Sequence, residues 1–259
     1  MTSHIALHND APIEMIGGNP STIEATASSL AARHGSLPAP SLLRAMIEHE
    51  FPGRIALVSS FGAESATLLH MVAQIDASMP VLFINTEKLF PETIFYRDLL
   101  IRQLGLKDTR EIRPDSVALA EHDPDGNLWQ RNPDFCCLLR KTQPLDSALS
   151  RFSAWITGRK QIHGGARQSL PVIEAADGRI KINPLAHWSQ DDLDSYAADH
   201  ELPAHPLVEH GYQSVGCMPC TQPVLRGENP RDGRWRGTNK VECGIHLPRT
   251  RFDRPRENS

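Results

Sequence analysis

The chain has 259 residues, 40% of them hydrophobic, and a formal net charge of −4, which is ordinary for a globular protein and excludes a fibrous or fully disordered one. An acidic chain is a poor general binder of nucleic acid, because the phosphate backbone repels it. The first twenty residues lack a basic start followed by an apolar run, and no stretch is apolar enough to span a bilayer. We therefore predict a cytoplasmic protein with neither a membrane nor a nucleic-acid partner.

The charge is unevenly distributed. Residues 221–259 contain nine Lys and Arg against five Asp and Glu, so this end carries an excess of four positive charges while the rest is acidic. Such asymmetry fits a C-terminal segment that contacts a small anion, and it fits a solvated basic tail equally well.

The first half of the chain alternates between strand and helix patterns. Residues 1–20 are predicted to be disordered, and Ser21 and Glu24 then have capping-box spacing before a helix. The stretch RIALVSSFGAESATLLHMVAQI has the pattern of a buried strand, a small-residue turn and a helix. PVLFINTEKLFPETIFYRDLLIRQLGL repeats it, with a helix entered at Pro91. This alternation predicts parallel βαβ units and an α/β fold.

The second half begins with further strands and ends in loops. SAWITG is a predicted strand, LPVIEA and RIKINPL form a predicted hairpin around Asp177 and Gly178, and Ser189 with Asp192 predicts another helix start. After Pro203, Pro and Gly become frequent. We predict a single α/β domain over residues 21–247, in which residues 221–247 form a mobile segment, followed by a disordered basic tail over residues 248–259.

The turn SSFGAES, between a predicted strand and helix, has the composition of an anion-binding loop. Small residues let backbone N–H groups point at an anion, and the helix N-terminus adds a favourable dipole. Many α/β turns of this composition bind nothing, and this one lacks the Lys of a P-loop.

Four of the five cysteines form two close pairs. Cys136 and Cys137 are adjacent, and Cys217 and Cys220 are the first and last residues of the stretch CMPC. Disulfides are not expected in a cytoplasmic chain. Four thiolates can hold a tetrahedral zinc or an iron–sulfur cluster, and the alternative is reduced thiols that never meet. Adjacent ligands are awkward for a zinc knuckle, but spacing alone favours neither metal strongly.

The fifth cysteine, Cys243, lies near Lys240 and His246 in a basic segment, where its nucleophilic thiolate form would be stabilised. A lone cysteine near a terminus is also often incidental. Two basic groups, Arg140 with Lys141 and Arg231 with Arg234, would suit phosphate or sulfate oxygens, although a solvated surface has the same composition.

Seven segments in this order, SSFGAES, FINTEKLFPET, CCLLRK, WITGRK, GYQSVGCMPC, NPRDGRWRG and ECGIHL, resemble the assimilatory adenylyl-sulfate and phosphoadenylyl-sulfate reductases. The resemblance runs from about Arg54 to Leu247. It implies an adenine-nucleotide α-hydrolase-like Rossmann variant, with a mainly parallel sheet flanked by helices and a flexible C-terminal segment.

The resemblance also implies a reaction. Cys243 would attack the sulfur of a bound sulfonucleotide, AMP would leave, and reduced thioredoxin or glutaredoxin would release sulfite from the S-sulfo-cysteine, in sulfate assimilation for cysteine biosynthesis. The reductant must be a separate protein, because the chain has no CxxC in a thioredoxin-like context. A homo-oligomer is compatible with the sequence.

The resemblance assigns roles to further residues. One 4Fe–4S cluster per chain would be held by Cys136, Cys137, Cys217 and Cys220, with Lys141 close to it. Arg231, Arg234 and His246 match positions that contact the phosphosulfate, and the nucleotide loop matches Ser59, Ser60, Gly62 and Glu64. Members with both cysteine pairs generally use adenylyl sulfate rather than its 3′-phosphorylated form.

Two positions depart from the family pattern: Asn85 replaces a common acid, and the segment after TG is unusual. The sulfate-side arginine is therefore either Arg159 or Arg167.

Three other hypotheses compete with this one. A phosphoadenylyl-sulfate reductase would lack the cluster. An ATP pyrophosphatase-type ligase or adenylyltransferase would share the fold, although Cys243 argues against it. A zinc-stapled binding module would leave Cys243 without a role.

Overall fold

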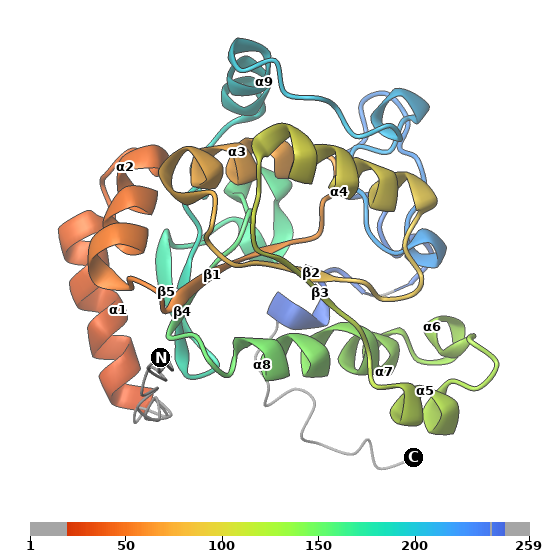
Figure 1. The fold of residues 1–259 in the computed structure, drawn as a ribbon. Helices are drawn as coiled ribbons and strands as arrows, with labels where there is room; N and C mark the ends of the chain where they lie inside the picture. Colours follow the sequence, from red (N-terminus) through yellow and green to blue (C-terminus); the bar gives the residue numbers. More distant parts are fainter. Residues whose placement is uncertain (1–19, 239, 247–259) are drawn as a thin grey trace, which may run out of the picture.

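A six-stranded sheet organises the protein, whose computed structural model describes residues 20–238 and 240–246 (Figure 1). The strand order is β3-β2-β1-β4-β6-β5, and all pairings are parallel except that of β5 with β6. The strands are β1 (Ile55–Ser59), β2 (Val81–Ile84), β3 (Thr109–Ile112), β4 (Ala154–Ile156), β5 (Ile173–Ala176) and β6 (Arg179–Ile182). The predicted mainly parallel α/β fold is confirmed.

Helices cover both faces of this sheet. They are α1 (Pro20–His34), α2 (Ala39–Arg44), α3 (Ser65–Asp76), α4 (Pro91–Leu104), α5 (Ser116–His122), α6 (Leu128–Arg131), α7 (Pro133–Cys137), α8 (Gln143–Leu149) and α9 (Gln190–Asp199). Short tighter or wider turns include η1 (Ala45–Glu50), η2 (Leu138–Thr142), η3 (Gln161–His163), η4 (Gly165–Arg167), η5 (Val208–His210), η6 (Met218–Cys220) and η7 (Gly244–His246). In Figure 1, α3 and α4 lie on one face, and α7, α8 and η7 lie on the other.

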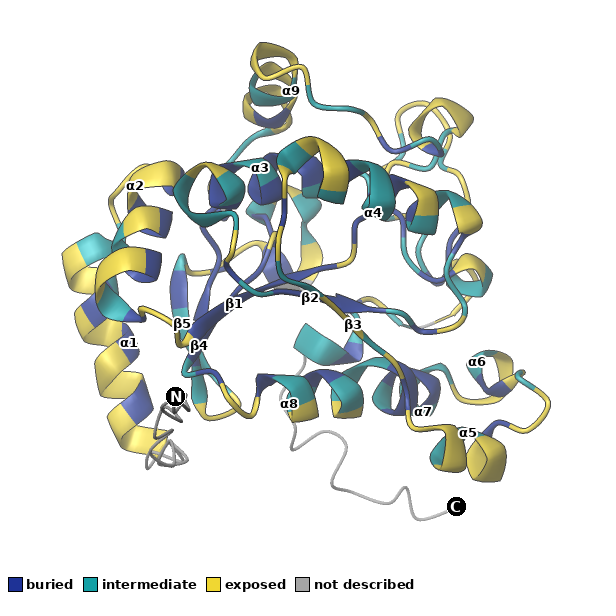
Figure 2. Cartoon of the chain, viewed as in Figure 1, coloured by how far each residue is buried: buried dark blue, intermediate teal, exposed yellow. Residues whose placement is uncertain are grey.

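The central strands are buried on both sides, which explains their continuous apolar sequences. Every residue of β1, β2 and β4 is buried (Figure 2). In β1, Ile55 and Leu57 face the main core under α1–α4, whereas Ala56 and Val58 face a second core with Leu145 and other residues of α8. Ile245 packs against this second core, so burial of η7 fixes the C-terminal segment to the sheet.

Local sequence signals account for several boundaries. The predicted hairpin between β5 and β6 is confirmed, and Asp177 (φ 50°) and Gly178 (φ 78°) have the positive φ angles of a tight hairpin turn. The capping box of Ser189 and Asp192 starts α9 as predicted. At α1 the prediction is wrong in detail, because the helix begins at Pro20 and Ser21 therefore lies inside its first turn.

The predicted disorder of residues 1–20 and 248–259 falls, apart from Pro20, outside the described residues, as does Leu247 at the end of the predicted domain. Within the described part, no helix has the length and apolarity needed to cross a membrane.

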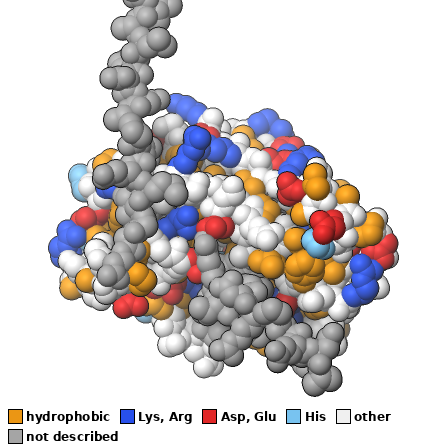
Figure 3. Space-filling model, turned by 90° about the horizontal axis from the view of Figure 1, so that it is seen from below, with side chains coloured by type: hydrophobic (Ala, Val, Ile, Leu, Met, Phe, Trp, Pro, Cys, Tyr) orange, Lys and Arg blue, Asp and Glu red, His pale blue; other side chains and the backbone are white. Residues whose placement is uncertain are grey.

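Short helices beside the C-terminal segment expose apolar side chains. Helix α5 contains no buried residue, and Val117 is 72% exposed. Behind it, Trp129 and Phe135 are partly buried in a small cluster with Leu128 and Cys136. Apolar side chains gather on the face of the molecule that Figure 3 presents. The α5–α7 region is thus held by a small core of its own.

His205 ties the loop after α9 to α4. Its Nε2 lies 3.1 Å from Thr93 Oγ1, and the Leu207 N–H donates to its Nδ1 at 3.2 Å. Because Nδ1 accepts a hydrogen bond, the ring proton of the neutral histidine lies on Nε2. Burial lowers the pKa of His205 to about 4. The connection leading to residues 213–217 therefore depends on an uncharged histidine.

We predict that the free energy of unfolding falls as the pH drops from 6.5 to about 4, because the unfolded chain then protonates His205 and the folded chain does not. The loss should reach about 3 kcal/mol at the low end. Urea unfolding across this pH range measures it, with His205→Asn as comparison. A variant whose stability falls with pH as steeply as that of the wild type would contradict the prediction.

Candidate active site

A cavity of about 210 Å³ lies at the carboxyl ends of β1, β2 and β4, and we call it the central cavity. Its lining includes Ser59, Ile84 and Thr157, which end or directly follow these strands. Between β1 and β4 the strand order reverses, and ligands of open α/β sheets bind at such a switch point. The sheet topology alone therefore makes this cavity the expected binding site.

The predicted nucleotide loop forms one wall of the central cavity. Ser59, Ser60, Gly62 and Glu64 all line it. Phe61 is buried with a positive φ of 48°, and its N–H donates to Ser59 Oγ at 3.2 Å. A Cβ on Gly62 would lie 3.1 Å from the Val215 carbonyl oxygen, so the glycine lets the 213–217 segment approach closely.

Glu64 forms ion pairs within this wall. Its Oε2 lies 2.7 Å from Lys160 Nζ and 3.2 Å from His163 Nε2. Burial opposes ionisation of Glu64, but His163 and Lys160 outweigh it and lower the pKa of Glu64 to about 2. Glu64 is therefore charged and joins the nucleotide loop to the strand-end segment after β4.

Positive charge dominates the central cavity. Among the described residues, six cationic side chains line it: Lys141, Arg159, Lys160, Arg167, Arg231 and Arg234. The carboxylates in the lining are Glu64 and Glu242. This excess of positive charge suits an anionic ligand, which would replace the missing counter-charges.

Both candidates for the sulfate-side arginine line the central cavity, and each already holds a carboxylate. Arg159 pairs with Glu174, and its Nε donates to Asn183 Oδ1 at 3.3 Å. Arg167 donates two hydrogen bonds to the Glu242 carboxylate, from Nε at 2.6 Å and from Nη2 at 2.9 Å. The structure brings both arginines to the cavity and does not choose between them.

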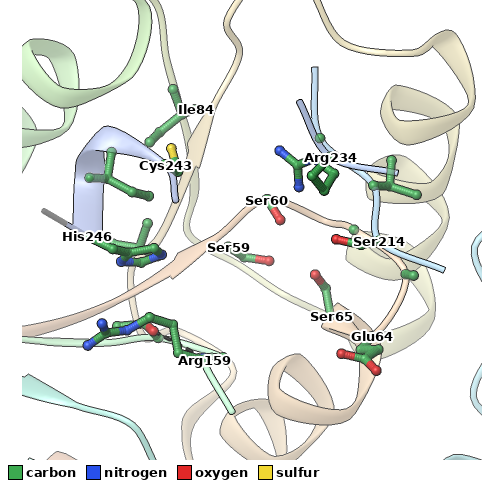
Figure 4. Close-up of a pocket in the computed structure, with 18 of the residues that line it drawn as sticks. Ser59, Ser60, Glu64, Ser65, Ile84, Arg159, Ser214, Arg234, Cys243 and His246 are labelled. Carbon is green, nitrogen blue, oxygen red and sulfur yellow. Dashed lines mark hydrogen bonds between the residues drawn. The ribbon is translucent and has the colours of Figure 1, made fainter. Parts of the chain in front are cut away.

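Arg234 is the most available guanidinium. Its Nε is buried, with no hydrogen-bond partner among the described residues, and its Cζ lies 4.6 Å from the ring centroid of Trp235. A Cβ on Gly216 would lie 2.3 Å from Arg234 Nη2, so the guanidinium rests in a space that glycine leaves open. Figure 4 shows Arg234 across the cavity from Cys243 and His246, with Ser60 between them.

His246 and Cys243 enter the central cavity on one short segment that ends in η7. The His246 ring is parallel to the Trp155 ring, with centroids 6.2 Å apart, and its Nδ1 is buried without a described partner. Burial, together with Lys181 and Arg159, lowers the pKa of His246 well below its usual value. His246 is thus a neutral imidazole in a cationic surrounding.

Cys243 is set apart from the other thiols by its electrostatics. A hydrogen bond from the Cys137 thiol lowers the pKa of Cys243 well below the usual thiol range; burial opposes this, and Lys141 adds to it. For Lys141, burial disfavours the charge, but Cys217, Cys243 and Cys137 outweigh it and raise its pKa. Cys243 is therefore the thiol best suited to be a nucleophile.

The two cysteine pairs lie on separate elements that meet beside the loop after β2. Cys136 and Cys137 end α7. Cys217 directly precedes η6, and its backbone pairs with that of Leu89 in an isolated antiparallel β-bridge. Thr86 Oγ1 lies 3.2 Å from Cys217 Sγ. Burial and the neighbouring Cys217 raise the pKa of Cys136 to about 11, and the same two causes raise that of Cys220. These thiols therefore lie near one another.

The donor set fits a thiolate-bound metal centre in its chemistry, because thiolates are the soft donors that zinc and iron–sulfur clusters take, and Cys137 and Cys217 lie near the cationic Lys141. The described residues contain no group of three or more Cys, His, Asp or Glu side chains arranged to hold a metal ion. Cys137 also lies next to Cys243 and lowers its pKa.

One basic residue singled out from the sequence does not belong to the site. Arg140 is buried and donates to Asp123 Oδ2 at 2.6 Å and to the Thr86 carbonyl oxygen at 2.9 Å. The sequence left an anion contact and a solvated surface open for Arg140, and the structure instead buries it in an ion pair with Asp123. On the wide turn η2, the two neighbours point to different partners, and Lys141 alone lines the central cavity.

Trp155, Lys160, His163 and Glu242 are among the lining residues that sequence reasoning missed. Lys160 and Glu242 lie inside the segments WITGRK and ECGIHL, so their positions next to singled-out residues were a usable signal. The partners of Glu242 are 75 and 11 residues away, and no local pattern predicts such pairing.

Comparisons with known proteins agree with this geometry. Residues 54–223 match the phosphoadenosine phosphosulfate reductase domain. An adenosine 5′-phosphosulfate reductase of Mesorhizobium japonicum is 48% identical over 91% of this chain and 93% of its own length. The chain belongs to the adenylyl-sulfate and phosphoadenylyl-sulfate reductase family. The family predicted from the sequence is confirmed.

Two further comparisons agree with this assignment, one in sequence and one in fold alone. A phosphoadenosine 5′-phosphosulfate reductase of Gloeobacter violaceus is 35% identical over 86% of this chain and 95% of its own length. The crystal structure of a phosphoadenylyl-sulfate reductase from Candida auris, in a phosphate complex, has a TM-score of 0.63 at 24% identity, covering 79% of this chain and 98% of that one. That similarity supports the shared fold.

We predict that Glu64→Gln lowers the free energy of unfolding by about 3 kcal/mol, because it leaves Lys160 buried without its counter-charge. Adding Lys160→Met should restore most of that loss. Urea unfolding of the single and double variants measures the coupling.

The matched control is Glu48→Gln, which breaks the exposed pair of Glu48 with Arg44 and should change stability by less than about 0.5 kcal/mol. If Glu64→Gln is as mild as this control, Glu64 is not a structural anchor of the loop.

Proposed function

We propose that this protein reduces adenylyl sulfate to sulfite and AMP, with an S-sulfo-cysteine intermediate on Cys243. One observation carries the proposal: Cys243 lines a cationic cavity at the switch point of the sheet, with Lys141 beside it. The family membership supports a reductase that acts on sulfur compounds in sulfate assimilation. We place this activity in the cytoplasm, as part of cysteine biosynthesis.

In the proposed first step, the Cys243 thiolate attacks the sulfur of adenylyl sulfate. A sulfur–sulfur bond forms, the bond from sulfur to the bridging phosphate oxygen breaks, and its electron pair leaves with AMP. Lys141 keeps Cys243 ionised. Arg234, whose Nε has no described partner, is the donor we assign to the oxygens of the phosphosulfate, and Arg231 assists it.

The other lining residues bind and orient the nucleotide. We assign Ser59, Ser60 and Gly62 to the nucleotide, because their loop lies between β1 and α3 and lines the central cavity. The neutral His246 offers its unpartnered Nδ1 to a substrate oxygen. Arg159 and Arg167 both line the central cavity, and both are candidates for binding the sulfate group of the substrate.

In the proposed second step, a reduced thioredoxin or glutaredoxin attacks Cys243 Sγ. Sulfite leaves with the electron pair of the sulfur–sulfur bond, and the resulting mixed disulfide is resolved by the second thiol of the reductant. Two electrons pass from the dithiol to the substrate sulfur, which balances the reaction. We propose that the segment carrying Cys243 moves away from the cavity when the reductant attacks.

We propose that Cys136, Cys137, Cys217 and Cys220 hold a 4Fe–4S cluster. The nature of the donor set and the proximity of Cys137, Cys217 and Cys220 to Lys141 support this assignment. When bound, the cluster would supply a charged group whose field couples through Lys141 to the anionic substrate. With all four cysteines present, we further propose that adenylyl sulfate is preferred over its 3′-phosphorylated form.

We predict that Cys243→Ser binds adenylyl sulfate about as tightly as the wild type but forms no S-sulfo adduct, because the hydroxyl of serine is far less ionised than the thiol. Intact-protein and peptide mass spectrometry after incubation with adenylyl sulfate, without reductant, detects the adduct. The wild type should gain one sulfo group on the peptide with Cys243. An adduct in the variant would overturn the assignment.

We also predict that Cys217→Ala, purified without oxygen, loses most of its iron and acid-labile sulfide, because a cluster that lacks one thiolate is exposed to solvent. Colorimetric iron and sulfide assays measure this, and Cys243→Ser is the matched cysteine control that should retain both. Equal iron in the wild type and Cys217→Ala would contradict the cluster assignment.

A further inference from the structure

Glu242 precedes the nucleophile and is buried, although it is an acid on a segment with an excess of basic residues. Its Oε2 accepts from Arg167 Nε at 2.6 Å, and its Oε1 accepts from Arg167 Nη2 at 2.9 Å and from Arg231 Nη2 at 3.1 Å. A single carboxylate therefore engages two guanidinium groups of the central cavity.

The same carboxylate fixes the backbone of the nucleophile. The Cys243 N–H donates to Glu242 Oε1 at 2.8 Å. Arg167 ends η4 on the segment after β4, and Arg231 lies in the loop after η6, so Glu242 joins three chain segments at one point. Any shift of this carboxylate would move Cys243 with it.

A second contact anchors the segment from the other side. Lys240 Nζ pairs with Asp134 Oδ1 on α7 and lies 5.7 Å from the ring centroid of Trp235. The two contacts precede Cys243 by three residues and by one. Because both contacts are noncovalent, they can break to release the segment and then form again.

The two arginines held by Glu242 also face the space where an anion would bind. Arg167 and Arg231 line the central cavity together with Arg234. The three donors that Glu242 engages are the kind that a phosphate or sulfate group takes from arginine. A substrate anion that uses either arginine must share it with Glu242 or replace it.

We propose that Glu242 is a positioning residue that holds Cys243 at the central cavity by occupying Arg167 and Arg231, in competition with the anionic end of the substrate. This inference rests on the proposed function for the identity of the substrate. The bound substrate then shares these arginines with Glu242 and weakens the hold on the Cys243 segment without releasing it, while the Lys240–Asp134 contact keeps the segment near α7.

The test is Glu242→Gln, which keeps the shape but removes the charge. In a Cys243→Ser background, where no adduct forms, the Kd for adenylyl sulfate should fall roughly fivefold, because a competing charge of modest strength is gone. When Cys243 is intact, Glu242→Gln should lower the single-turnover rate of adduct formation at saturating substrate roughly tenfold or more, because the thiol is held less well. A purely structural residue would weaken both.

The matched control is Glu228→Gln, which removes an exposed acid of the same segment that pairs with Arg236. It should leave both Kd and rate unchanged. Asp134→Asn releases the other anchor without touching the arginines, so it should slow adduct formation and leave Kd unchanged.

A further readout does not depend on the reaction. Alkylation of Cys243 by iodoacetamide, followed peptide by peptide and compared as the pH-independent rate constant of the fully ionised thiol, should be several-fold faster in Glu242→Gln than in the wild type and unchanged in Glu228→Gln. If the wild type forms no adduct but alkylation follows this pattern, the proposed function fails and the positioning role stands. If Glu242→Gln leaves alkylation unchanged, or weakens binding and rate together, the inference is overturned.

Discussion

The excess of buried positive charge at the carboxyl ends of β1, β2 and β4 is the constraint on which the rest of the site depends. Buried charges are tolerated when they are paired and hydrogen-bonded, and an unpaired one destabilises the fold. Lys160 is held by Glu64, Arg159 by Glu174, and Arg167 by Glu242. Among the described residues Arg234 has no such acid, and it lies against Trp235 in the space left by Gly216. The fold thus neutralises most of the site and leaves one guanidinium for a ligand.

The C-terminal segment completes this arrangement. Ile245 packs on the second core, His246 stacks against Trp155, and Glu242 closes the arginine cluster, so apolar burial and ion pairing fix the same few residues. Cys243 is held between them, next to Cys137 and Lys141. A nucleophile on a segment held by side-chain contacts can be both precise in one state and accessible to a protein reductant in another.

Much of the fold could be predicted from the sequence, because its signals are local. Continuous apolar runs gave the buried parallel strands, and Asp177-Gly178 and Ser189 with Asp192 gave the hairpin turn and a helix start. The candidate site residues were found through segments that resemble a family, and most of them line one cavity. The ion pairs could not be predicted from the sequence. Arg140 pairs with Asp123 while its neighbour Lys141 lines the cavity, and the directions of these two side chains depend on the wide turn η2.

The most direct test of the proposed chemistry is sulfite release by anaerobically purified protein with reduced thioredoxin, comparing adenylyl sulfate with its 3′-phosphorylated form. We expect sulfite from both the wild type and Glu228→Gln, none from Cys243→Ser, and a clear preference for adenylyl sulfate. Sulfite production that survives in Cys243→Ser, or its absence from the wild type with either nucleotide, would contradict the role of Cys243. A preference for the 3′-phosphorylated form would contradict the proposed substrate.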